Sequence, residues 1–396
     1  MKFLARLYFL KFQSKLERNK ILYDIIFLSL YFFLYVLQLQ STIILSYIVA
    51  AIYAFFFLNG IKTSKQIFQI YSIVAALFLL SIINFNHGFT PLFHLIFLPV
   101  ILLIAHYFSK KQLVDLYQIF RAFQYQNIFL VTLGLLYNYN EIDPIGSIIP
   151  WVSRNGITSV LLVCQIIFSF VTYLYNKRFP IISSLLVVII SFYGLGRGSI
   201  IVSILLLLYG IFLNIANTKS KLFKISSIIG VIVLLFYFSS NTETITLVEN
   251  IEDGLNKTQF GQGYTDEART SINNEYISRL DTWNFIFGSS YINTSIEKNF
   301  GGNPHNSFIR LHSYYGIFGI IVLFLLLISI LIAKKNASRK FVLFGLLLLL
   351  LFRAYTEPIL FPSSLDLFFL IMIALFFREK DLLIHERNLT PNSYVN

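Results

Sequence analysis

The chain has 396 residues, of which 57% are hydrophobic and only 13% are charged. A soluble protein of this length could not keep such a surface in water, and the apolar runs are continuous, which indicates membrane-spanning helices. The net charge of +12 could suggest a nucleic-acid partner. It is concentrated in short loops between apolar runs, however, which is typical of membrane topology, so we expect membrane lipid and not nucleic acid as a partner.

Twelve apolar stretches are of a length suited to crossing a bilayer as helices. The predicted spans are residues 21–37, 41–58, 66–84, 91–108, 119–137, 156–175, 180–195, 199–216, 222–240, 306–333, 341–356 and 362–377. The sequence therefore predicts an all-α, polytopic integral membrane protein in which residues 1–396 form a single membrane domain.

The distribution of basic residues predicts the orientation of these spans. With the N-terminus inside, 23 of the 31 Lys and Arg residues fall in the inner segments, as expected for cytoplasmic loops. Both termini are then cytoplasmic, and the one long polar segment, residues 241–305 between spans nine and ten, is an extracytoplasmic loop. We expect this loop to carry part of an active site.

The long loop is acidic, with nine acidic and four basic residues. In its second half Ile272, Tyr276, Leu280 and Trp283 follow one another at helical spacing, which predicts a surface helix resting on the membrane helices. We expect this helix to end at Phe287-Gly288.

The charged and polar side chains that are candidates for a functional site lie at or near the predicted outer ends of the spans and in the long loop. Each of them has a structural alternative, such as a lipid contact, a local hydrogen bond or an internal ion pair. Arg197 stands between two glycines in a tight turn, which would bring the backbone close to a ligand. Arg353 and Glu357 are four residues apart and share one helical face. The remaining candidates are Arg154, Asn155, Arg269, Arg279, His305, Asn306 and Arg310.

Several kinds of site are missing from the sequence. There is no Asp-x-Asp pair on the predicted outer side, no zinc-ligand spacing, no phosphate-binding Walker loop and no Gly-x-Ser-x-Gly elbow. We therefore expect no metal and no cofactor. An enzyme on the outer surface has no ATP and needs an activated substrate such as a lipid-linked sugar diphosphate, which arginine side chains can bind in a bidentate manner.

Four motifs resemble those of the bacterial O-antigen polymerase/ligase family, whose members transfer glycans linked to undecaprenyl diphosphate. They are Arg154-Asn155 before span six, Gly196-Arg197-Gly198-Ser199 before span eight, Arg269 followed by Phe287-Gly288, and His305-Asn306-Ser307-Phe308 with Tyr315-Gly316-Ile317-Phe318-Gly319. Together they cover roughly residues 150–330, whereas the first four spans match in hydropathy alone.

The resemblance implies a metal-independent, inverting glycosyl transfer on the periplasmic side of a bacterial inner membrane. His305 would be the general base, and Arg197 and Arg269 would bind the diphosphate. Asn306 would orient the imidazole or the acceptor. The other residues implied to contact substrate are Arg154, Asn155, Arg279, Arg310 and Arg353. The expected partners are the undecaprenyl-diphosphate-linked oligosaccharide, membrane lipid, and chain-length regulator and flippase proteins.

Within this family we favour a polymerase, which joins one lipid-linked repeat to another. A ligase, which moves the finished glycan to lipid A-core or to protein, uses the same donor and remains an alternative. From another class, the chain could be a flippase for lipid-linked oligosaccharides or another transporter. That alternative would favour charges within the spans and broken helices in paired halves, whereas the predicted spans are nearly free of ionisable groups and show no such pairing.

Overall fold

The computed structural model has helices and no strands among the residues that it describes, which are 20–37, 40–57, 72, 75–76, 78–79, 90–141, 143–149, 154–194, 196–218, 267–291 and 293–378. Residues 20–36 form the first described helix. It is followed by α2 (Gln40–Phe57), α4 (Thr90–Lys110), α5 (Leu113–Tyr137), α6 (Arg154–Asn176), α7 (Ile181–Tyr193), α8 (Arg197–Asn217), α11 (Glu267–Ser278), α12 (Thr282–Phe287), α13 (Ser295–Phe300), α14 (Ser307–Ile332), α15 (Ala337–Thr356) and α16 (Asp366–Phe377).

Helices occur at ten of the twelve predicted spans within the described residues, with ends that agree to within a few residues. Four of them are long and apolar enough to cross a membrane, namely Leu92–Lys110, Asn155–Asn176, Gly198–Asn217 and Ser307–Ile332. These findings are consistent with an all-α membrane protein. Predicted span nine and residues 241–266 of the long loop lie outside the described residues, as does most of predicted span three.

Helix α6 lies at the centre of the bundle. Its span is 100% buried within the protein, compared with 28% for the span in α14. It packs against α5, α7, α8, α15 and α16. The exposed surfaces of α4, α8 and α14 are apolar, as expected for helices that face lipid.

Polar side chains inside the bundle pair with one another. Gln124 on α5 donates to Gln165 on α6 at 2.9 Å, and Gln165 donates to Ser184 on α7 at 3.0 Å. Hydrogen bonds of this kind between apolar helices contribute about 1 kcal/mol each. They fix which faces of α5, α6 and α7 meet, and so hold α6 in its central position.

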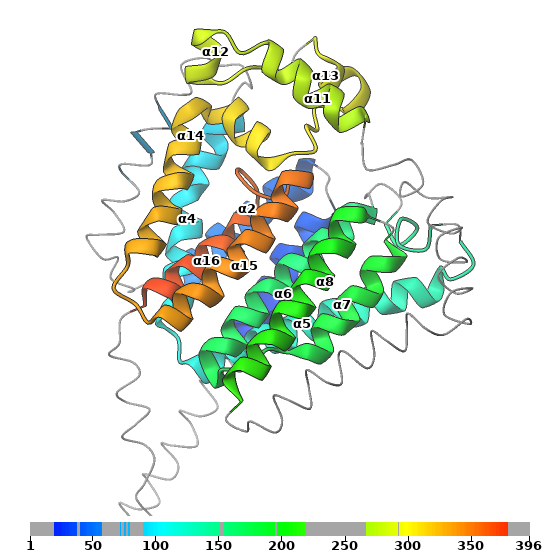
Figure 1. Ribbon diagram of the computed structural model, residues 1–396, viewed down its shortest axis with the longest axis vertical. Helices are drawn as coiled ribbons and strands as arrows, with labels where there is room; N and C mark the ends of the chain where they lie inside the picture. Colours follow the sequence, from blue (N-terminus) through cyan, green and yellow to red (C-terminus); the bar gives the residue numbers. More distant parts are fainter. Residues whose placement is uncertain are drawn as a thin grey trace, which may run out of the picture.

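The described part of the long loop lies across one end of the bundle, which we call the loop end (Figure 1). The predicted surface helix is split in two. Asp281 accepts a hydrogen bond from the Asn284 amide at 2.7 Å and so caps a new helix, α12. Ile272 and Tyr276 on α11 are buried as predicted, but Trp283 falls in α12 and is 54% exposed. Placing Trp283 on the buried face was therefore wrong, whereas the predicted end at Gly288 is confirmed.

Candidate functional site

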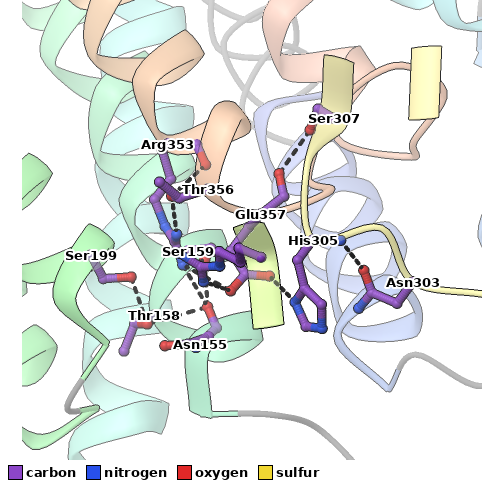
Figure 2. A network of polar contacts seen from close by, with 11 residues as sticks. Asn155, Thr158, Ser159, Ser199, Asn303, His305, Ser307, Arg353, Thr356 and Glu357 are labelled. Atoms are coloured by element: carbon purple, nitrogen blue, oxygen red, sulfur yellow. Dashed lines mark hydrogen bonds and ion pairs between the residues drawn. The ribbon is translucent and has the colours of Figure 1, made fainter. Parts of the chain in front are cut away.

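The carboxylate of Glu357 is the meeting point of three cationic or titratable side chains at the loop end. Its Oε1 lies 3.4 Å from Arg269 Nη2 and 3.9 Å from Arg353 Nη2, and its Oε2 lies 3.8 Å from His305 Nδ1. We call these four residues the Glu357 cluster. They come from α11, from the loop before α14 and from the end of α15, so the cluster joins the loop to the helical bundle (Figure 2).

Arg353 fixes the inner side of the cluster. Its side chain is 2% exposed, and its guanidinium donates to Ser159 on α6, to the Asn155 carbonyl at 3.4 Å and to Thr356 at 2.6 Å. A buried arginine with this many partners is held rigidly. The sequence prediction that Arg353 and Glu357 share a face is confirmed, and Arg353 acts here as a support for Glu357.

The glycines on either side of Arg197 are needed because the start of α8 lies against the same cluster. A Cβ atom added at Gly196 would lie 2.0 Å from Asn155 Oδ1, and one added at Gly198 would lie 2.9 Å from Arg353 Nη1. The side chains of Arg154 and Arg197 are outside the described residues. The backbone that carries Arg197 nevertheless borders the Glu357 cluster, as the Gly-Arg-Gly pattern suggested.

Asn155 presents a buried acceptor at this border. Its Oδ1 atom is buried and has no hydrogen-bond partner among the described residues. A buried, unpaired amide oxygen costs roughly 1–3 kcal/mol. The expected contact of Asn155 with substrate stays a prediction.

His305 enters the cluster from a strained backbone position. Its φ of 49° lies in the left-handed region, which costs a non-glycine residue of the order of 1 kcal/mol. The side chain of Asn303 offsets part of this cost by accepting a hydrogen bond from the His305 amide at 2.9 Å. The imidazole is 31% exposed and turns Nδ1 toward Glu357 (Figure 2).

The side chain of Asn306 has a structural task, and its expected role toward the imidazole or the acceptor stays a prediction. Its side-chain oxygen accepts hydrogen bonds from the Phe308 amide at 2.8 Å and the Ile309 amide at 3.3 Å, so it caps the N-terminus of α14. The carboxylate that faces the His305 ring belongs to Glu357. Ser307 completes this arrangement, because its hydroxyl donates to the Glu357 carbonyl at 2.8 Å and accepts from the Leu360 amide at 3.1 Å.

The charges of the cluster keep Glu357 ionised. Burial alone would raise the pKa of Glu357, but the nearby His305 ring and the charges of Arg353 and Arg269 outweigh burial and lower that pKa. Glu357 is therefore ionised at neutral pH. Among the described residues two guanidinium groups face this carboxylate, and the side chain of Arg269 is 32% exposed.

The other two arginines expected to contact substrate lie outside the cluster. Arg310 Nη2 donates to the Leu360 carbonyl at 2.9 Å, so it supports the segment that follows Glu357. Arg279 lies near Glu275, whose pKa is lowered first by hydrogen bonds from Ser295 and also by the charge of Arg279. Of Arg269 and Arg279, Arg269 is the one that reaches the Glu357 cluster.

Two important residues were not identified from the sequence. Glu357 was noted only as a partner of Arg353, because its contacts with residues 269 and 305 depend on tertiary structure. His312 was given no role. In the structure its Nε2 atom lies 2.9 Å from the Phe285 carbonyl, which must accept, and its Nδ1 atom lies 2.8 Å from the Tyr276 hydroxyl. His312 thus fastens α11 and α12 to α14.

The described residues contain no group of three or more His, Cys, Asp or Glu side chains that could hold a metal ion. The groups able to bind a ligand at the loop end are arginine, histidine and amide side chains. Comparison of the chain with protein-family models, with curated proteins and with solved structures gives no match.

Proposed function

We propose that the protein is a membrane glycosyltransferase that uses a lipid-diphosphate-linked glycan, and that it acts as a polymerase of O-antigen or a related surface polysaccharide. The observation that supports this most directly is the convergence of Arg269, Arg353 and His305 on Glu357 where the loop meets the bundle. A surplus of guanidinium charge next to an imidazole is what a metal-independent transfer from a diphosphate requires.

The proposed reaction joins two lipid-linked repeats. A hydroxyl oxygen of the acceptor sugar attacks the anomeric carbon of the donor, and the bond from that carbon to the diphosphate oxygen breaks. The electron pair leaves with the lipid diphosphate, and the hydroxyl proton passes to Nε2 of His305. Arg269 and Arg197 offset the negative charge that develops on the diphosphate.

Glu357 has a supporting role in this reaction. It faces Nδ1 of His305, so the charge that the ring gains on accepting a proton is stabilised by an adjacent carboxylate. It also holds Arg269 against the bundle. The full proposal includes twelve spans, a bacterial inner membrane, cytoplasmic termini and a periplasmic site, all of which follow from the sequence pattern and the resemblance.

The test is glycan extension by purified protein in vesicles that contain the lipid-linked repeat. His305→Ala should lower the rate by about 10²-fold or more, and Arg269→Gln should also abolish extension. The matched control is Lys298→Gln, which removes an exposed cation of the same loop and should leave the rate unchanged. Wild-type extension by both site variants would refute the proposal.

The same assay separates the alternatives. A polymerase forms products with several repeats from a single lipid-linked substrate, whereas a ligase needs lipid A-core or a protein acceptor. A flippase moves the labelled substrate across the vesicle membrane without forming a new glycosidic bond. In cells, loss of a polymerase leaves lipid A-core that carries a single repeat. Loss of a ligase leaves free lipid-linked polymer and lipid A-core without glycan.

A further inference from the structure

Helix α12 has an unusual surface for a segment expected to face water. Among its six residues are Trp283, Phe285, Ile286 and Phe287, and none of the helix's residues is buried within the protein. Trp283 is 54% exposed and Phe285 is 48% exposed. Leaving this much aromatic surface in water is costly, at roughly 25 cal/mol for each Å² that could have been buried.

The exposure results from how α12 is attached to α14. The backbone of α12 makes part of this contact, because His312 Nε2 donates to the Phe285 carbonyl at 2.9 Å. Two glycines allow the close approach. A Cβ atom at Gly288 would lie 2.4 Å from the Ser313 carbonyl oxygen, and one at Gly316 would lie 1.9 Å from the Ile286 carbonyl oxygen. Both glycines have positive φ angles. Trp283 and Phe285 thus remain about half exposed, although the Phe285 ring also lies 5.9 Å from the His312 ring.

The aromatic surface continues onto the lipid-facing side of α14. The rings of Trp283 and Phe287 are 4.3 Å apart, and the rings of Phe287 and Phe318 are 6.3 Å apart. Further along α14, about one and nearly two turns after Phe318, Ile321 and Phe324 are 41% and 62% exposed. We call Trp283, Phe285, Phe287 and Phe318 the aromatic strip. It joins α12 to a surface whose apolar composition suits a bilayer.

A second short helix of the same loop shows what a water-facing surface looks like here. Helix α13 also has six residues, and its exposed side chains among those described are Glu297, Lys298 and Asn299. Figure 1 shows α12 above the end of α14, whereas α13 lies beside α11 away from that end. The two short helices therefore differ, with aromatic side chains exposed on α12 over α14 and polar or charged side chains exposed on the described part of α13.

We propose that α12 lies in the bilayer itself, at the boundary between lipid head groups and acyl chains, and that lipid is the partner of the aromatic strip. Tryptophan and other aromatic side chains are enriched at this boundary because the rings are apolar but tolerate nearby polar groups. Lipid contact then acts together with His312 to hold α12 in place. Because α11 is joined to α12 through residues 279–281, this contact also restrains the helix that carries Arg269.

The chain permits a direct test, because it contains only two tryptophans. In Trp151→Phe, Trp283 is the sole tryptophan. The purified variant is placed in phosphatidylcholine vesicles whose acyl chains carry bromine at defined depths. We expect the fluorescence of Trp283 to be blue-shifted. Bromine near the head-group end of the acyl chains should quench most of this fluorescence. Bromine near the bilayer centre should quench less, and aqueous iodide should quench little.

The matched control moves the tryptophan to α13. In Trp151→Phe, Trp283→Phe, Asn299→Trp, the sole tryptophan should be quenched by iodide and not by brominated lipid. Iodide quenching of Trp283 without bromine quenching would overturn the proposal, because α12 would then face water. Protection of Trp283 from both quenchers would also overturn it, because protein would then cover the aromatic strip. None of these outcomes depends on glycan transfer, so the result stands apart from the proposed function.

Discussion

Two buried carboxylates, Asp24 and Glu357, show how differently one chain can use the same chemical group. Asp24 lies near the start of the first described helix, and Tyr35 lies near its other end. Tyr35 is close to the segment that carries Glu357, because it accepts a hydrogen bond from Ser363, six residues after Glu357. Eleven residues separate Asp24 from Tyr35, or about 16 Å at 1.5 Å per residue. The two carboxylates therefore lie toward opposite ends of the bundle.

The surroundings of Asp24 are balanced and closed. Lys111 Nζ lies 2.6 Å from its Oδ2, and the hydroxyls of Tyr53 and Tyr107 both donate to its Oδ1. The side chains of Asp24 and Lys111 are only 2% and 11% exposed. One negative charge is paired with one positive charge, and both side chains are too buried to contact a ligand from solvent.

The surroundings of Glu357 are unbalanced and partly open. Two arginines and a histidine face one carboxylate, and Arg269 and His305 are each about one-third exposed. A purely structural pair does not need this exposure. The comparison indicates that the Asp24 pair stabilises the fold, whereas the exposure of the Glu357 cluster supports the proposal that it binds a substrate.

Removing the charge of Glu357 should have the largest effect. In Glu357→Gln the amide keeps the size of the side chain but leaves Arg353 buried without a counter-charge. We expect glycan extension to fall about 10²-fold or more. The free energy of unfolding should fall by about 3 kcal/mol, the lower end for a broken buried pair, because Arg353 keeps its bonds to Ser159 and Thr356. Normal extension by a folded Glu357→Gln protein would remove Glu357 from the site.

Breaking the Asp24 pair should affect stability alone. Lys111→Met leaves a buried carboxylate without its cation, which should cost about 3 kcal/mol of unfolding free energy. Glycan extension per folded molecule should stay at the wild-type rate. The double variant Asp24→Asn, Lys111→Met should recover most of the stability, as measured by thermal unfolding in detergent. A fall in the rate per folded molecule would show that the two carboxylates are not separate in function.

The helices could be predicted closely because each depends on a local pattern. Continuous apolar runs mark α6 and α14, and the glycines around Arg197 mark the turn before α8. The split between α11 and α12 also had a local signal, since Asp281 three residues before Asn284 is a common helix cap. The helical spacing of apolar residues across 272–283 predicts one continuous helix and so outweighs this cap signal. Asn306 also carries a cap signal, because asparagine is favoured at the start of a helix.

The Glu357 cluster could be predicted only in part, because its members are far apart in sequence. The pairing of Arg353 with Glu357 follows from their spacing, but residues 269 and 305 reach the same carboxylate through the packing of α11 and α14. His312 shows the same limit. Nothing in its local sequence indicates that Tyr276, 36 residues earlier, and the Phe285 carbonyl would lie on opposite sides of its ring.

The pH dependence of stability gives the smallest effect and a further test of the charge on Glu357. The pKa of this carboxyl is held below its ordinary value of 4.5, so the folded state favours the ionised form more than the unfolded state does. Its contribution is fully present above about pH 5 and is lost as the pH falls through the folded pKa. The difference in unfolding temperature between wild type and Glu357→Gln should therefore be constant from about pH 7 to pH 5 and shrink below about pH 4.5. Glu275, whose pKa is also lowered, is present in both proteins and cancels in the difference. A gap that persists unchanged at the lowest pH would show that the ionised carboxylate of Glu357 is not what stabilises the folded state.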